Sequence, residues 1–196
     1  MIGTIITALI SSFITAFFAY SFTQYLNFED KNAERIAILT ALQSELSSLL
    51  YLIHSREDDF KTYDPSDLPK GSLPYIPITL NYFSVFESLS AKFGLITNSA
   101  LVSEIIRTYM ETKGLFENVK DLEYFAKQSH ALIITPPQKF ELLDILISFH
   151  NGYRESLLEI QIPLVETLIQ TCINDINKEK ESISLKNTFL EYFLKF

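Results

Sequence analysis

The first 28 residues carry no charged side chain, and within them pairs of small residues alternate with pairs of large apolar ones. As a helix, residues 2–22 would measure about 31 Å, close to the thickness of a bilayer core. The Ser and Thr hydroxyls in this stretch can bond back to their own helix, so they permit insertion. A cleaved secretory signal would require basic residues before the apolar run, and none is present there. The pattern therefore predicts that residues 1–28 are an uncleaved transmembrane anchor.

Small residues recur at every fourth position of this segment, which places them along adjacent ridges of a helix. The predicted contact face comprises Gly3, Thr7, Ser11, Thr15 and Ala19 on one ridge, with Ala8, Ser12 and Ala16 on the next. Ridges of small side chains allow two membrane helices to approach closely. Two alternatives stay open: membrane helices are rich in such residues anyway, and several assembled spans could line a narrow polar path with their hydroxyls.

A second apolar pattern follows the anchor, in steps of three and four residues typical of a helix. Its members, which we call the seam, are Leu39, Leu42, Leu46, Leu49 and Ile53. No Gly or Pro lies between Thr4 and Asp64, so the simplest prediction is one helix from the membrane to about His54. A break at residues 27–30 is the alternative, because Asn and Asp favour helix caps. At two heptads, the seam is better explained by core packing within the chain than by a coiled coil.

The remaining chain alternates helical patterns with breaks. Residues 55–77 contain four prolines and several acids, which predicts an irregular acidic crossover loop. Helical spacing then predicts a short helix over residues 79–93, a longer one capped by Thr97 or Asn98, and another that starts at Thr135-Pro136 and is kinked by Pro163. Residues 178–181 read as a charged junction. We therefore expect an all-α protein in which residues 29–196 form an antiparallel bundle of about four to six helices.

The last residues carry one more apolar pattern. Leu185, Phe189, Phe193 and Phe196 fall on one face of a helix, with lysines outside it. This stretch can pack on the bundle or lie on the membrane surface, and the sequence favours the bundle.

Composition restricts location and partners. The net charge of -8 disfavours nucleic acid, because an acidic domain repels phosphate backbones. No basic residue precedes the anchor, whereas Lys31 and Arg35 follow it, so the bundle is expected in the cytoplasm and the anchor in a bacterial inner membrane. Aromatic residues from Tyr20 to Phe28 fit the belt found at a membrane interface. The expected partners are the lipid bilayer and another membrane helix, from a second copy or a different protein; a cytoplasmic protein is a further candidate.

Residues that could perform chemistry are scattered. The histidines, His54, His130 and His150, are far apart and match no metal-binding spacing, and Cys172 has no second cysteine to pair with. Glu155 and Glu159 lie four apart but lack the Glu-x-x-His repeats of a carboxylate-bridged metal site. We therefore expect no catalytic or metal-binding residue and no cofactor.

One family resemblance rests on two stretches, Tyr82 to Leu89 and Leu101 to Tyr109, separated by Gly94-Leu95-Ile96. This pattern resembles small bacterial proteins, mostly uncharacterised, that have one N-terminal membrane helix and a cytoplasmic helical bundle. The resemblance covers about 30 residues and brings no catalytic residue. It implies a role in phage defence or envelope stress.

The expected function is association: a membrane-anchored oligomeric subunit or effector. One alternative is a membrane-permeabilising effector whose assembled spans form a polar path. A second alternative is an anchored enzyme of unknown reaction.

Overall fold

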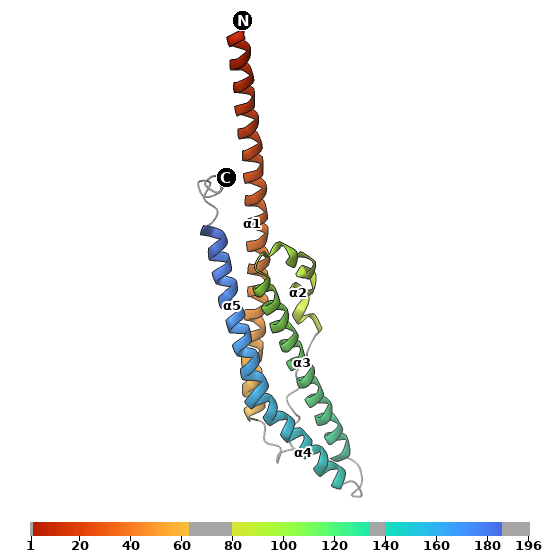
Figure 1. The fold of residues 1–196 in the computed structure, drawn as a ribbon. Coiled ribbons are helices and arrows are strands. Elements are labelled where there is room, and N and C mark those ends of the chain that lie inside the picture. Colours follow the sequence, from red (N-terminus) through yellow and green to blue (C-terminus); the bar gives the residue numbers. More distant parts are fainter. Residues whose placement is uncertain (1, 63–79, 134–139, 186–196) are drawn as a thin grey trace.

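The computed structural model describes residues 2–62, 80–133 and 140–185 (Figure 1). Its elements are α1 (Ile2–Thr62), the 3-10 helix η2 (Leu80–Phe83), α2 (Ser84–Leu89), the 3-10 helix η3 (Ser90–Leu95), α3 (Ser99–Ile133), α4 (Phe140–Ser156), the π-helix η5 (Leu157–Gln161) and α5 (Ile162–Leu185). No strand occurs among the described residues. The predicted all-α class is confirmed.

The helix α1 is continuous over 61 residues, about 90 Å of helix. The alternative break at residues 27–30 is absent. The helix also runs past His54, so the prediction of irregular structure from residue 55 onward was wrong for residues 55–62. This stretch precedes the first proline and is supported by an ion pair four residues apart, in which the Lys61 ammonium lies 2.5 Å from the Glu57 carboxylate. The rest of the predicted loop, residues 63–77, lies outside the described residues.

The single helix predicted over residues 79–93 is instead divided among η2, α2 and η3. At the start of α2, the Val85 and Phe86 amides donate to the Glu45 carboxylate of α1, so a side chain from another helix supplies acceptors where the new helix begins. The next start was predicted correctly, because the Leu101 amide donates to the Asn98 side-chain oxygen at 3.2 Å, an N-cap for α3. The helix α3 then continues through Gly114 to Ile133.

The helices α4, η5 and α5 follow one another without a break, and the chain changes direction where they meet (Figure 1). Pro163 has no amide hydrogen and its ring crowds the preceding turn. The widened turn of η5 lies directly before it, where the Ile162 amide donates to the Leu157 carbonyl five residues back. A π-turn at this point separates the proline ring from the carbonyl it would otherwise meet. Residues 178–181, predicted as a junction, are helical.

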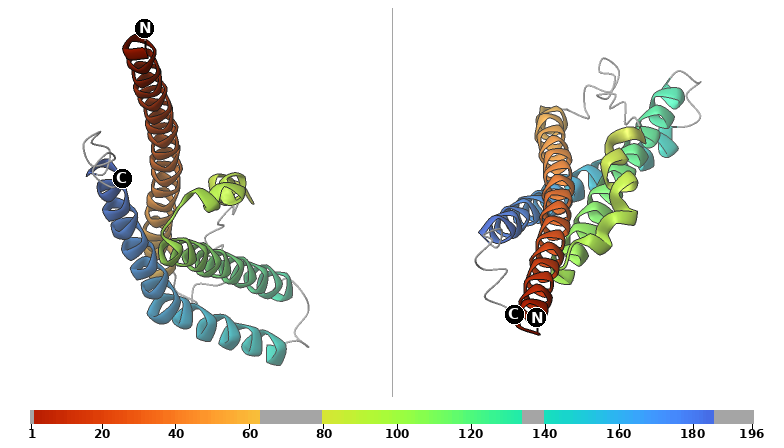
Figure 2. Two further views of the ribbon diagram at one scale, coloured as in Figure 1. Left: turned by 45° about the horizontal axis from the view of Figure 1, so that its top comes forward. Right: turned by 90° about the horizontal axis from the view of Figure 1, so that it is seen from above.

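The core lies where α1, α3 and α5 pack together, with α5 running antiparallel to α1 (Figures 1 and 2). The short helices η2, α2 and η3 contact α1, and α4 packs beside α3. We call the described residues from 29 onward the helical body. The N-terminal part of α1 projects beyond this body and is not covered by the other described helices (Figure 2).

Candidate membrane-contacting segment

The projecting segment, residues 13–28 of α1, exposes large apolar side chains around most of the circumference of the helix. Phe13 is 75% exposed. The others of this kind are Ile14, Phe17, Phe18, Tyr20, Phe22 and Leu26. Apolar surface costs about 25 cal/mol per Å² when it stays in water, and soluble proteins rarely leave such a continuous run uncovered. The segment therefore needs an apolar environment.

The predicted helix–helix contact face lies on this segment and on the turns before it. Thr15, Ala16 and Ala19 are exposed. The Thr23 hydroxyl donates to the Ala19 carbonyl at 2.9 Å, which shows how a hydroxyl in this helix is satisfied without an outside partner. The side chains of Gly3, Thr7, Ala8, Ser11 and Ser12 lie outside the described part of the structure, although these residues belong to α1.

Among the residues that the structure describes, two helical stretches are long and apolar enough to cross a membrane, Phe13–Glu57 and Ser148–Leu185. The two stretches differ in whether their apolar side chains are buried in the core of the body. The second stretch places Ile162, Ile169 and Ile176 in the core of the body, together with Val165, Cys172, Ile173 and Ile183. The first stretch does so only in its C-terminal part, while its N-terminal part projects. Residues 13–28 are therefore the stronger candidate for contact with lipid.

The five seam residues are at most 3% exposed and belong to one hydrophobic core with α3 and α5. Leu39, Leu42 and Leu46 have no exposed surface at all. They pack against other helices of the same chain. The same helix thus presents apolar residues to the core at one end and to its surroundings at the other.

Glu45 holds a position that the sequence pattern did not reveal. Its carboxylate accepts hydrogen bonds from the Val85 and Phe86 amides at 2.8 and 2.9 Å, and from the Tyr109 hydroxyl at 2.8 Å. One side chain of α1 therefore caps the start of α2 and binds α3. The available signal was that Glu45 is the only Asp, Glu, Lys or Arg between Arg35 and Arg56.

Tyr109 extends this link through its ring. It stacks on Phe86 with centroids 4.2 Å apart and planes 20° from parallel, and it meets the edge of Phe83 at 6.2 Å. Burial, and secondarily the Glu45 carboxylate, raise the pKa of Tyr109 far above its usual value. The hydroxyl therefore stays protonated and remains a donor to Glu45.

At the end of the body nearest the projecting segment, two basic residues link α1 to η3. The Arg35 guanidinium donates to the Leu95 carbonyl of η3 and to the side-chain oxygen of the buried Asn32. The Lys92 ammonium of η3 lies 2.8 Å from the Glu34 carboxylate. Contacts between α1 and the body thus reach to about Asn32, one helical turn from the projecting segment.

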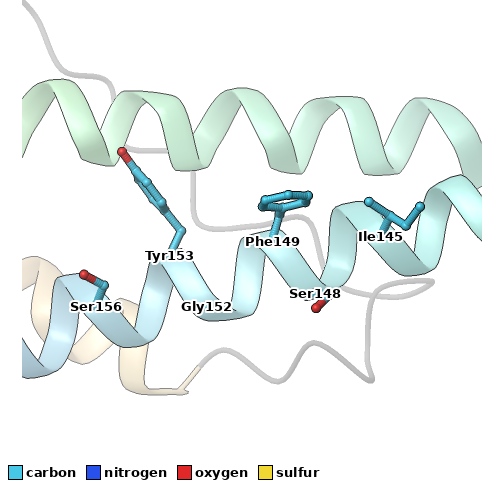
Figure 3. Close-up of a pocket in the computed structure, with 6 residues that line it drawn as sticks. All are labelled: Ile145, Ser148, Phe149, Gly152, Tyr153 and Ser156. Carbon is cyan, nitrogen blue, oxygen red and sulfur yellow. The ribbon is translucent and has the colours of Figure 1, made fainter.

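An open pocket of about 530 Å³ lies on α4 at the opposite end of the body. It is lined by Ile145, Ser148, Phe149, Gly152, Tyr153 and Ser156. In Figure 3, Phe149 and Ile145 extend from α4 on the side facing α3, and Phe149 is 65% exposed. The Tyr153 hydroxyl, the one titratable group of the lining, donates to Asn118 of α3 at 3.0 Å. The described lining residues offer mainly apolar surface.

The groups with potential for chemistry do not converge in the described residues. His54 Nε2 lies 2.9 Å from the Glu166 carboxylate. His150 is buried, and burial lowers its pKa. Within the part of the chain that the structure describes, no three His, Cys, Asp or Glu side chains are placed to hold a metal ion. The side chain of His130 lies outside that part.

Cys172 is expected to be unreactive in the folded protein. Burial raises its thiol pKa from 9.0 to about 12. The thiol therefore stays protonated in the fold, and alkylation by iodoacetamide at about pH 8 should require unfolding. The raised pKa also predicts that stability is unaffected below pH 9.0 and falls between about pH 9 and 12, because only the unfolded chain then releases the proton.

Urea unfolding at a series of pH values would measure this loss, which approaches about 1.4 kcal/mol per pH unit. In the matched variant Cys172→Ala, the free energy of unfolding should depend less on pH between pH 9 and 10, before tyrosines ionise in the unfolded chain. Equal slopes for the two proteins, or rapid alkylation of the native thiol, would contradict the prediction.

Comparison with known proteins adds no functional information. No protein-family model, curated protein or solved structure matches the chain.

Proposed function

We propose that the protein is a single-pass membrane protein that acts by association, as an oligomeric subunit or effector of a bacterial inner membrane. Residues 1–28 are its anchor, and residues 29–196 form an antiparallel helical bundle in the cytoplasm. The observation that carries this proposal is the projecting segment, which exposes large apolar side chains around most of its circumference and continues into the core part of α1 without a break.

The orientation is supported by the charges beside the anchor. Lys31 and Arg35 lie just after the projecting segment, and residues 1–28 contain no Lys or Arg. Arg35 also binds the carbonyl of Leu95, so this charge belongs to the folded body and would cross the membrane only with it. This arrangement favours the body on the cytoplasmic side.

Association is supported by the small residues of the anchor and by the continuity of α1. A ridge spaced by four lets two helices approach closely in lipid, where close packing is a main source of affinity. Because α1 is a single helix, two anchors in contact would fix the distance between their bodies. The two parts of the chain would then act together.

The variants Thr7→Leu and Ser11→Leu are expected to weaken self-association, because a leucine on the small ridge keeps the two backbones apart. In an oligomerisation reporter for membrane spans, each variant should reduce the signal several-fold, corresponding to about 1 kcal/mol. The matched control Ile10→Leu conserves volume and lies off the ridge, so its signal should equal that of the parent. A signal unchanged in both ridge variants would exclude the predicted face.

A further inference from the structure

The π-turn η5 sets the rotation of α4 relative to α5. A π-turn is closed by a hydrogen bond between residues five apart instead of four, so it contains one residue more than a regular helical turn. Here the Ile162 amide bonds to the Leu157 carbonyl. The extra residue rotates α4 by about 100° from the position it would have if α5 continued as a regular helix. The π-turn therefore determines which side of α4 faces α3.

One side chain of α3 bridges this turn. The half-buried Asn118 accepts a hydrogen bond from the Tyr153 hydroxyl at 3.0 Å, and its amide group donates to the Gln161 side-chain oxygen at 2.6 Å. Tyr153 lies on α4 one turn before η5, and its ring is directed toward α3 (Figure 3). Gln161 is the last residue of η5. Asn118 therefore binds the helix on both sides of the extra residue.

The spacing of these two partners matches the π-turn. Tyr153 and Gln161 are eight residues apart. In a regular α-helix, residues eight apart point about 80° away from each other and lie about 12 Å apart along the axis. With one residue taken up by the π-turn, the spacing is equivalent to about seven residues, which lie within about 20° of one another on the same side. Both side chains then face Asn118, so the pair of bonds fits the π-turn better than a regular helix.

A regular helix at η5 would change the side chains that α4 presents. With α5 fixed, each place on α4 would pass to the next residue in the sequence. Arg154 would take the place of Tyr153, and the Tyr153–Asn118 bond would be lost. His150, now 4% exposed, would take the place of Phe149, which is 65% exposed, and Asn151 would take the buried place of His150. The open pocket on α4, now lined by Phe149 and Tyr153, would then carry a histidine and an arginine.

We propose that η5 gives α4 two rotational positions and that Asn118 is the positioning residue that selects the described one. Pro163 disfavours the regular helix from within the chain, because its ring crowds the preceding turn. Asn118 favours the π-turn from the neighbouring helix. A change that withdraws Asn118 from its two partners would rotate α4 by one residue and exchange the side chains of the pocket. The inference concerns the helical body alone and does not depend on the anchor.

Thiol reactivity distinguishes the two positions of α4. Single cysteines would be introduced into full-length Cys172→Ala protein in detergent, as His150→Cys or Asn151→Cys, and alkylated with iodoacetamide. In the described position, the thiol at 151 should react faster, because Asn151 is partly exposed and His150 is buried. After rotation by one residue, the thiol at 150 should react faster. Local unfolding of α4 would instead make both react rapidly.

The test is best made in a Pro163→Ala background, where a regular helix is sterically permitted. In this background alone, the thiol at 151 should remain the faster one, because Asn118 still holds the π-turn. Adding Asn118→Leu should invert the order, since loss of two hydrogen bonds shifts the ratio of the two positions by about 30-fold, or about 2 kcal/mol. The matched control Glu117→Leu makes a similar change at the exposed neighbouring position of α3 and should leave the order unchanged.

Three results would overturn the proposal. An unchanged order after Asn118→Leu would exclude a role for Asn118, and inversion by Pro163→Ala alone would assign the position of α4 to the proline. Rapid alkylation at both sites after Asn118→Leu would exclude a second ordered position. If far-UV circular dichroism shows that Asn118→Leu does not fold, Tyr153→Phe removes only one of the two bonds. It should shift the ratio of the two rates about fivefold toward position 150, and an unshifted ratio would contradict the proposal.

Discussion

Replacing Glu45 with alanine is expected to lower the free energy of unfolding by about 3 kcal/mol or more, because three donors lose a charged acceptor together. The Val85 and Phe86 amides and the Tyr109 hydroxyl all bind this carboxylate. Tyr109 is 2% exposed, so water reaches its hydroxyl poorly once Glu45 is gone. Thermal unfolding of the full chain in detergent, followed by far-UV circular dichroism, would measure the change.

Two control variants separate this role from loss of charge or of helix propensity. Glu111→Ala removes an exposed glutamate from α3 and should change stability by less than about 0.5 kcal/mol. Glu45→Gln keeps the shape but turns one acceptor into a donor that faces an amide hydrogen, so about half of the loss should remain. If Glu45→Ala were as stable as Glu111→Ala, the carboxylate would not hold α2 and α3 to α1.

The predictions that the structure confirmed depend on residues that lie close together in the sequence. The continuity of α1 follows from the absence of Gly and Pro over about 60 residues, and the burial of Leu42 and Leu46 from helical spacing. Asn98 was one of the two caps predicted for α3, because capping needs only the next few residues, and the structure shows that it is the cap. These features require no knowledge of which helices meet.

The features that the sequence did not reveal depend on contacts between distant residues. Glu45 lies 40 residues from Val85 and 64 from Tyr109, and nothing near it in the sequence distinguishes a helix cap from a solvated acid. The division of residues 80–95 among three short helices includes a helix start at which the Val85 and Phe86 amides bind Glu45 of α1, a contact between residues 40 and 41 positions apart. For the candidate membrane segment, the sequence predicted the apolar run, and the structure added that every residue from 13 to 20 is exposed.

A lysine placed at any of four consecutive positions in the projecting segment is expected to reduce membrane integration. The variants are Phe13→Lys, Ile14→Lys, Thr15→Lys and Ala16→Lys, which point in four directions around α1. Each puts a charge near the middle of the predicted span, at a cost of about 2.5–3.5 kcal/mol, which is a factor of about 100 in the equilibrium. Resistance of the full chain to extraction from membranes by alkaline carbonate would measure integration.

The comparison among the four directions decides what surrounds the segment. Lipid surrounds a single span, so all four variants should be extracted more readily than the parent. A segment that docks in the groove of another soluble protein would tolerate lysine on its outward side, so full retention of any one variant would contradict the anchor. The control Tyr25→Lys lies at the predicted interface, where the long side chain extends to the headgroups, and it should be retained. Loss of integration at Tyr25 as well would place the membrane further along α1, next to the helical body.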